Sequence, residues 1–191
     1  MRKVAMEDIA GFSAYEKMRA KFRERIIELK RRRRVSVGGK VTLVFENRDT
    51  VIFQIQEMVR AEKIGDLDKI GEEIDVYNEL IPEPGELSAT LFLEIEDQAH
   101  LRDELLKFLG IDEAVYLKIG HHSIHARFEE GRSKEDKISA VQYVKFRFSE
   151  AALQAFEKGE NAELVIDHPH YKANAPLGPE TRQTLLEDLT T

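Results

Sequence analysis

The stretch VTLVFENRDTVIFQIQEMVRAEK, residues 41–63, decides the fold of the N-terminal half of this chain. It begins with an apolar run, Val41–Phe45, which is typical of a buried strand. A charged turn follows, and then Val51, Ile55 and Val59 recur at helical spacing. We therefore expect a strand that passes directly into a helix, capped by Asp49 or Thr50.

The flanking segments complete a helical first half. A helix is predicted from Ser13 to about Arg33, followed by a hairpin in which Gly38-Gly39 joins residues 35–37 to the strand at 41–45. A further helix is predicted over residues 66–80, with Leu67 on its apolar stripe, and the segment Pro82-Glu83-Pro84-Gly85 ends it.

The second half is rich in β-branched and aromatic runs. Strands are predicted at residues 87–95, 115–119, 123–128, 141–148 and 162–167, and helices at 97–109, 149–158 and 179–189, with a loop around Pro176. This order predicts an α+β fold with a mostly antiparallel sheet in the C-terminal half and the N-terminal helices packed against it. We expect one domain, residues 1–191, with a sub-boundary at 82–86.

Composition restricts the chemistry that the chain can perform. Of its 191 residues, 42% are hydrophobic and 34% charged, as in ordinary globular proteins. No apolar run has the length of a membrane span, and no export signal is visible, so we expect a cytoplasmic protein. The chain has no cysteine, which excludes thiolate catalysis and cysteine-held iron–sulfur clusters. Electron carriers would belong to another protein.

Charge is distributed unevenly along the chain. Residues 17–34 hold ten Lys and Arg against two Glu, a net +8, so with a total of −7 the remainder carries −15. This pattern predicts either an electrostatic docking strip or a basic segment that folds back on the acidic body. The docking segment would be Lys30, Arg31, Arg32, Arg33 and Arg34. An alternative is that these cations bind nucleic acid phosphates.

Polar residues concentrate around the strand-to-helix turn. They are candidates for a binding site beneath the turn, with Gln56 and Arg60 one helical turn apart: Glu46, Asn47, Arg48, Gln54, Gln56, Glu57, Arg60 and Glu62. No nucleophile or base stands out among them. The alternative is a capped turn followed by a solvated helix face joined by i, i+4 pairs.

Histidines offer a second candidate site. His121 and His125 would be about 13 Å apart on one strand, too far for one ion. His168 and His170, next to Tyr171, would share a strand face about 6.6 Å apart and can hold a divalent metal if a carboxylate such as Asp167 or Glu57 joins them. In that alternative the protein is a metal-dependent enzyme, with Arg60 or Arg48 holding an anionic substrate. We otherwise expect no cofactor.

Three motifs in order carry a family resemblance: KRRRRV at 30–35, FENRDTVIFQIQEMVRAEK at 45–63 and DHPHY at 167–171. With them, nearly the whole chain resembles a bacterial family known as domain of unknown function 3501. The resemblance implies no activity and no catalytic residues. It further implies a genomic association with rubrerythrin-like and iron–sulfur oxidoreductases, and hence an accessory role.

The leading hypothesis is accordingly a non-catalytic accessory or binding protein. It would partner an iron–sulfur or rubrerythrin-like oxidoreductase and dock through the basic helix end and the strand-to-helix turn. The metal-dependent enzyme and the nucleic-acid-binding protein remain as alternatives. A structure in which the DHPHY segment and the turn at residues 46–50 converge on one cavity would favour both as parts of one site.

Overall fold

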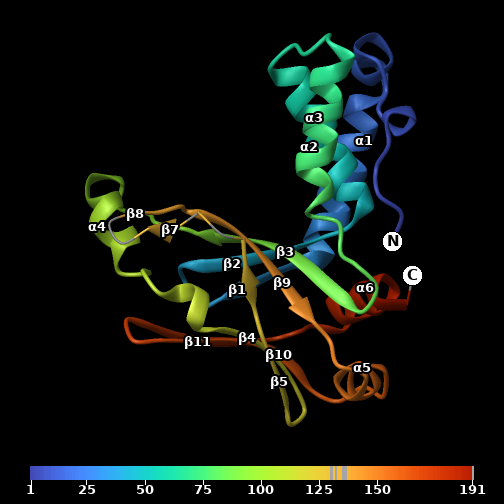
Figure 1. Ribbon diagram of the computed structural model, residues 1–191. Coiled ribbons are helices and arrows are strands. Elements are labelled where there is room, and N and C mark those ends of the chain that lie inside the picture. The colour runs from blue at the N-terminus through green and yellow to red at the C-terminus, as the bar shows by residue number, and fades with distance from the viewer. Residues whose placement is uncertain (130, 132, 135–136, 191) are drawn as a thin grey trace.

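Two antiparallel sheets form the body of the protein (Figure 1). The computed structural model describes residues 1–129, 131, 133–134 and 137–190. The first sheet has the order β1-β2-β3-β9-β6, formed by Arg34–Val37, Val41–Glu46, Glu86–Leu93, Val141–Arg147 and Arg127–Phe128. The second has the order β11-β10-β4-β5, formed by Tyr171–Pro176, Ala162–His168, Val115–Ile119 and His122–His125. A short pair, β7 (Ser133–Lys134) and β8 (Lys137–Ile138), lies apart.

The helices fall into two groups in Figure 1. Helices α1 (Phe12–Arg33), α2 (Arg48–Ala61) and α3 (Leu67–Asn78) stand together at one end of the first sheet and form an arm that rises away from it. The remaining helices lie around the sheets: α4 (Leu101–Leu106), α5 (Glu150–Glu157) and α6 (Pro179–Thr190). Short 3₁₀ turns occur at Met6–Asp8, Gln98–His100 and Ile111–Glu113. In the part of the chain described, every helix is too short or too polar to cross a membrane.

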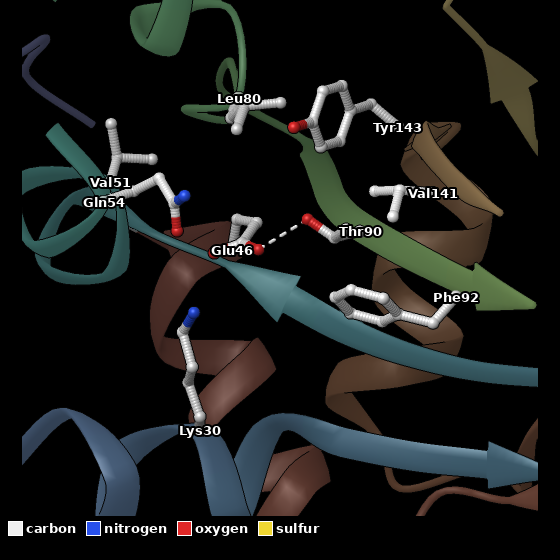
Figure 2. Close-up of a pocket in the computed structure, with 9 residues that line it drawn as sticks. All are labelled: Lys30, Glu46, Val51, Gln54, Leu80, Thr90, Phe92, Val141 and Tyr143. Atoms are coloured by element: carbon white, nitrogen blue, oxygen red, sulfur yellow. Dashed lines mark hydrogen bonds between the residues drawn. The ribbon is translucent and has the colours of Figure 1, made fainter. Parts of the chain in front are cut away.

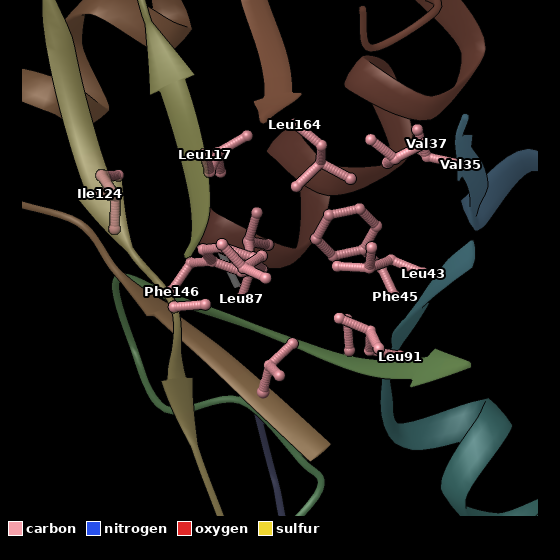
Figure 3. Close-up of a cluster of buried hydrophobic side chains, with 14 of the residues drawn as sticks. Val35, Val37, Leu43, Phe45, Leu87, Leu91, Leu117, Ile124, Phe146 and Leu164 are labelled. Carbon is pink, nitrogen blue, oxygen red and sulfur yellow. The ribbon is translucent and has the colours of Figure 1, made fainter. Parts of the chain in front are cut away.

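The pair of sheets and the helical arm each have their own hydrophobic core. The larger cluster fills the space between the two sheets, where Phe45, Leu91, Leu117, Phe146 and Leu164 meet (Figure 3). A smaller cluster holds the arm together, and its members are Val4, Val51, Ile55, Val59, Ile70, Ile74, Leu80 and Ile81. Burial of these apolar surfaces is the main stabilising contribution to both parts.

The α+β class predicted from the sequence is confirmed, and all pairing between strands is antiparallel. The predicted hairpin is present as well, since β1 and β2 pair from Arg34↔Val44 to Val37↔Val41 around the glycine turn. Helix α1 passes directly into β1: Arg34 adopts extended angles, φ −95° and ψ 130°, immediately after the last helical residue.

Several boundaries differ from the prediction for identifiable reasons. Helix α1 begins after Gly11 rather than at Ser13, and the cap of α2 is Asn47 rather than Asp49 or Thr50. The strand expected at 123–128 is two strands, β5 and β6, which belong to different sheets. The loop expected around Pro176 is β11, an edge strand, where proline costs no ladder hydrogen bond.

Two predicted helices also differ. The helix expected at 97–109 is a 3₁₀ turn followed by the six-residue α4. In α3, Leu67 is exposed rather than part of the apolar stripe, because it occupies the first turn, beyond the reach of α2. Asp66 and Ser149 cap α3 and α5.

The first sheet has one apolar and one polar face. Along β3, Leu87, Ala89, Leu91 and Leu93 point into the large core, so Glu86, Ser88, Thr90 and Phe92 point to the other side. Strand β2 adds Glu46 to that second face, and β9 adds Tyr143 opposite Thr90. The polar face lies at the foot of the helical arm (Figure 1) and positions the candidate site.

Candidate functional site

The strand-to-helix turn is closed by reciprocal hydrogen bonds. Asn47 precedes α2, and its Oδ1 accepts a hydrogen bond from the Thr50 backbone N–H at 3.1 Å. The Asn47 backbone N–H in turn donates to Thr50 Oγ1 at 2.9 Å. This capping box satisfies free N–H groups at the start of the helix and fixes the direction in which Glu46 and Thr50 point.

Glu46, the last residue of β2, is a buried carboxylate at this turn. Glu46 is only 7% exposed. The Thr50 hydroxyl donates to Oε2 at 2.5 Å, and the Thr90 hydroxyl donates to Oε1 at 2.6 Å. An ionised carboxylate offers about four acceptor positions, so these two donors leave part of its capacity unused.

A pocket of about 300 Å³ opens beside this carboxylate (Figure 2). Lys30, from the last turns of α1, extends toward Glu46 from one side, and Gln54 of α2 lies on another. The remaining lining is mostly apolar and comes from Val51, Leu80, Thr90, Phe92, Val141 and Tyr143. Of the acids that the structure describes, none lies within 4.0 Å of the Lys30 amine.

A second pocket of about 220 Å³ continues along the polar face and shares Leu80 and Tyr143 with the first. Two of its lining cations, Lys145 and Arg127, neutralise the buried Glu86 behind them, which is 2% exposed, at 3.3 Å and 3.4 Å. Because this carboxylate has two cations beside it, it needs no further charge. The Glu46 pocket therefore differs from it in having its acid and its cation on separate walls.

Arg33 holds the same turn from the opposite side. It is 0% exposed, and it donates to the carbonyl oxygens of Phe45 at 2.8 Å and Glu46 at 3.1 Å. Its guanidinium also forms an ion pair with Asp188 of α6. Burial raises the pKa of Asp188, and Arg33 opposes that rise. This member of the predicted docking segment is thus a structural residue.

The other arginines of that segment pair with acids of the chain itself. Arg31 contacts Glu28 at 3.0 Å and Glu180 at 3.1 Å, and Arg32 contacts Glu28 at 3.2 Å. Arg34 lies 3.5 Å from Glu94. Of the two arrangements predicted from the charge distribution, the structure has the one in which the basic segment folds back on acidic parts of the body.

Apart from Gln54, three candidates on α2 lie away from the Glu46 pocket: Arg48, Gln56 and Arg60. Gln56 is bound to the backbone of Ala10, with its Oε1 2.7 Å from the Ala10 N–H. Arg48 forms an ion pair with Asp8 at 2.5 Å and lowers the pKa of that carboxyl. Arg60 pairs with Glu16. These residues tie the N-terminal segment and α1 to α2, and Gln56 and Arg60 have different partners.

Glu57 is the centre of a polar contact between α1 and α2. Arg19 donates two hydrogen bonds of 2.7 Å to its carboxylate, and the Tyr15 hydroxyl donates a third, also of 2.7 Å. Arg19 is the main cause that lowers the pKa of Glu57, and the Tyr15 hydrogen bond adds to it. Burial, followed by the Glu57 contact, raises the pKa of Tyr15.

The DHPHY segment lies at the other end of β2. It forms the turn between β10 and β11, and the Tyr171 hydroxyl donates to the Val37 carbonyl at 2.6 Å and accepts from the Lys40 N–H at 3.0 Å. Since β2 separates Lys40 from Glu46 by its full length, on the order of 20 Å, the two motifs do not converge on one cavity.

His168 is buried, 2% exposed, and both of its ring nitrogens have partners. Nε2 lies 2.8 Å from the Leu109 carbonyl oxygen, so it is the donor, and Nδ1 accepts from the His170 N–H at 3.3 Å. His170 lies in the turn rather than on the same strand face as His168. Nowhere in the described residues do three or more His, Asp or Glu side chains gather as metal ligands would.

The outward side of α1 is largely uncovered. Only Tyr15, Ile26 and Arg33 of its 22 residues are buried. Phe12, Met18 and Ile27 are 57%, 45% and 53% exposed. The exposed cations Lys17, Lys21 and Arg23 have no acidic partner among the described residues. A groove of about 320 Å³ between α1 and α2 brings Met18 and Lys21 together with Phe22 and Ile52.

Sequence reasoning identified Glu46 and Gln54 but missed their neighbours. Thr90, Phe92 and Tyr143 come from strands that are distant in the sequence, and the register of those strands decides that they face Glu46. Alternation along residues 87–95 already places Thr90 and Phe92 on one face. The pairing of β2, β3 and β9 was the information that the sequence alone lacked.

Comparison with known proteins defines the family. The family described as Protein of unknown function (DUF3501) matches residues 3–189, so the chain belongs to this family, as its motifs predicted. A similar solved structure is that of a novel protein of unknown function from Burkholderia pseudomallei K96243, with 32% sequence identity and a TM-score of 0.92. It covers 98% of this chain and 100% of its own. A search of curated proteins finds no match.

Proposed function

We propose that the protein is a cytoplasmic accessory protein that binds a protein partner through the outward face of α1. The observation that carries the proposal is the exposure of Met18 beside Lys17 and Lys21, cations that no acid of the described chain neutralises. This surface replaces the run of residues 30–34 as the docking site, because the arginines of that run are paired internally.

Charge indicates the kind of partner surface. Lys17, Lys21 and Arg23 lie on a chain whose total charge is −7, so they form a local positive area on an acidic protein. Such an area guides an acidic surface to this helix and repels basic ones. The exposed apolar side chains of α1 supply the surface that a partner would bury in a specific contact.

The groove between α1 and α2 adds shape to this surface. Met18 and Phe22 from α1 and Ile52 from α2 line it. Of the charged residues in its lining, Arg25 is paired with Asp49 at 3.6 Å and Asp8 with Arg48, so Lys21 is the cation available to a partner among the described residues. A partner side chain that is apolar and flanked by acids fits this combination. Apolar anchors in pockets, surrounded by charges, are typical of protein–protein contacts.

An iron–sulfur or rubrerythrin-like oxidoreductase is the partner class that we propose. The resemblance of the motifs implies a genomic association with such oxidoreductases, and a chain without cysteine leaves cluster binding to the other protein. In this role the protein would position or protect its partner, and the partner would carry the electrons.

Affinity purification from the native host tests the proposal. We compare the tagged wild type with a triple variant, Lys17→Glu/Lys21→Glu/Arg23→Glu, and with a control triple variant, Arg102→Glu/Lys118→Glu/Lys158→Glu. The control makes the same change in charge at three exposed cations away from the arm. We expect the wild type and the control to recover one acidic protein with the absorption of bound iron, and the α1 variant to lose it.

Two results would contradict the proposal: recovery of the chain alone under gentle lysis, or equal recovery of the partner by both triple variants. Recovery of nucleic acid instead, falling steeply with salt, would favour the nucleic-acid alternative. Stoichiometric metal that is lost on changing His168 and His170 to alanine would favour the metal-dependent enzyme.

A further inference from the structure

The Glu46 pocket carries an inference that is independent of the docking surface. The pocket carries two opposite charges: Glu46 supplies a carboxylate on one wall, Lys30 extends an amine toward it from another, and apolar side chains line most of the remaining wall (Figure 2). Within the described chain, Glu46 and Lys30 do not approach within 4.0 Å, so the pocket separates two charges that would otherwise pair.

The carboxylate lacks a cation in contact with it. Thr50 and Thr90 are neutral donors, and Arg33 contacts the backbone oxygen of Glu46 rather than its side chain. A buried carboxylate is costly unless a charge or several hydrogen bonds compensate it. A ligand ammonium group, with three N–H donors, would fill the acceptor positions that the two hydroxyls leave.

The amine on the opposite wall completes the recognition. Lys30 has no acidic partner in the described residues, and its side chain is only half-exposed. An anionic group on the ligand would meet it. The part of the ligand that branches away from these two charged groups would contact Val51, Leu80 and Phe92, so it should be apolar. A volume of about 300 Å³ lies at the lower end of ligand pockets, which restricts the ligand to a small molecule.

We infer that the Glu46 pocket binds a small zwitterion, an α-amino acid with an apolar side chain, with its ammonium group on Glu46 and its carboxylate on Lys30. A metal ion fits these walls less well, because a hard cation takes six or more oxygen ligands and the side-chain oxygens of the lining come from only four residues, Glu46, Gln54, Thr90 and Tyr143. The capping box keeps Glu46 and Thr50 in place before the ligand arrives.

Titration calorimetry on the purified full chain tests this inference. The probes are L-valine, L-leucine, L-isoleucine, L-methionine and L-phenylalanine, together with two analogues of leucine: 3-methylbutylamine, which lacks the carboxylate, and 4-methylpentanoate, which lacks the amine. We expect at least one amino acid to bind. For leucine, each analogue should bind at least about tenfold more weakly, because each loses one charged contact.

Two variants assign the ends of the ligand. Glu46→Gln keeps the shape and can still bond both threonines, and Lys30→Met keeps the apolar stem. Each should weaken amino-acid binding at least about tenfold. The matched controls are Glu72→Gln and Lys69→Met, both on α3, exposed and outside the pocket, which should leave affinity unchanged.

The inference is overturned if none of the five amino acids binds, if the analogues bind as well as leucine, or if both pocket variants bind like the wild type. Should Glu46→Gln fail to fold, Lys30→Met alone decides, since the Lys30 amine has no acidic partner in the described chain whose loss would unfold it. The assay contains no protein partner. Its failure therefore leaves the docking proposal intact, and failure of docking leaves the pocket intact.

Discussion

Arg33 in the last turn of α1 and Asp188 in the last turn of α6 form a buried ion pair across 155 residues of sequence. The arginine side chain is fully enclosed, and the same guanidinium holds two backbone carbonyls at the end of β2. One side chain therefore joins the helical arm, the first sheet and the C-terminal helix.

Loss of Arg33 should be among the most destabilising changes in the chain. Arg33→Met leaves Asp188 buried without its cation and removes the donors to Phe45 and Glu46, so we expect a loss of about 3–5 kcal/mol in the free energy of unfolding. Arg32→Met is the control, because Arg32 is exposed and pairs only with Glu28; its cost should stay under about 0.5 kcal/mol. Urea denaturation measures both, and equal costs would contradict the assigned role.

Glu57 should stabilise the protein in a pH-dependent way. Its pKa in the folded state lies below the ordinary value of 4.5, chiefly because of Arg19. The folded state therefore favours the ionised form, and this contribution is present above about pH 4.5 and is lost as the pH falls through the folded pKa. Glu57→Gln should cost about 1–3 kcal/mol at pH 7.

The difference between wild type and Glu57→Gln should shrink when unfolding is measured at successively lower pH. Glu72→Gln is a suitable control because Glu72 is exposed on α3 and, among the described contacts, does not pair with Arg19. A cost for Glu57→Gln that is constant from pH 7 to the acid limit of the fold would show that charge plays no part.

The two glycines of the β1–β2 turn should respond differently to alanine. Gly38 has φ +70°, and an added Cβ would lie 2.3 Å from the Tyr171 hydroxyl oxygen, which two hydrogen bonds hold in place. Gly38→Ala should therefore cost about 1–3 kcal/mol. Around Gly39 no atom lies within 4 Å of the added Cβ, and its φ is not positive, so Gly39→Ala should be neutral or slightly stabilising. Thermal unfolding distinguishes them.

His168 should be a neutral imidazole with its proton on Nε2. The Leu109 carbonyl can only accept, and the His170 N–H can only donate, so one tautomer satisfies both contacts. Nitrogen-15 chemical shifts of the ring at neutral pH measure this directly. Added zinc should leave the Nδ1 resonance unchanged; a zinc-dependent shift of that resonance would favour the predicted metal role of His168 and His170.

The local elements of the fold were predictable where the sequence carries a local signal. Asn47 to Val59, the hairpin around Gly38 and the strand at 115–119 follow from spacing, turn residues and β-branched runs. Strand β11 was missed because Tyr171–Pro176 is a short polar edge strand that forms through pairing with β10. Residues 123–128 were read as one strand, since alternation cannot show that Ala126 marks the change of sheet.

The candidate site was predictable only in part, because strand pairing between distant segments leaves no local signal in the sequence. Glu46 stands in a conspicuous local motif, but the Thr90 hydroxyl that bonds it and the Tyr143 ring beside it arrive through long-range register. The basic run was visible in the sequence, whereas its internal partners Glu94, Glu180 and Asp188 lie about 60 to 155 residues away. The sequence shows that a segment carries an excess of positive charge. The fold determines which acidic residues neutralise that charge.

Helix α1 and strand β1 meet without a loop, so the chain turns from the helical arm into the sheet at a single residue (Figure 1). The change from helical to extended backbone occurs at Arg34. The residue before it, Arg33, is hydrogen-bonded to Phe45 and Glu46 and forms an ion pair with Asp188. Such a joint cannot act as a hinge while those bonds persist. A displacement of α1 at Phe12, its far end, is therefore transmitted to the sheet beside Glu46. Lys30, which lies on α1 one turn before Arg34, moves with the helix.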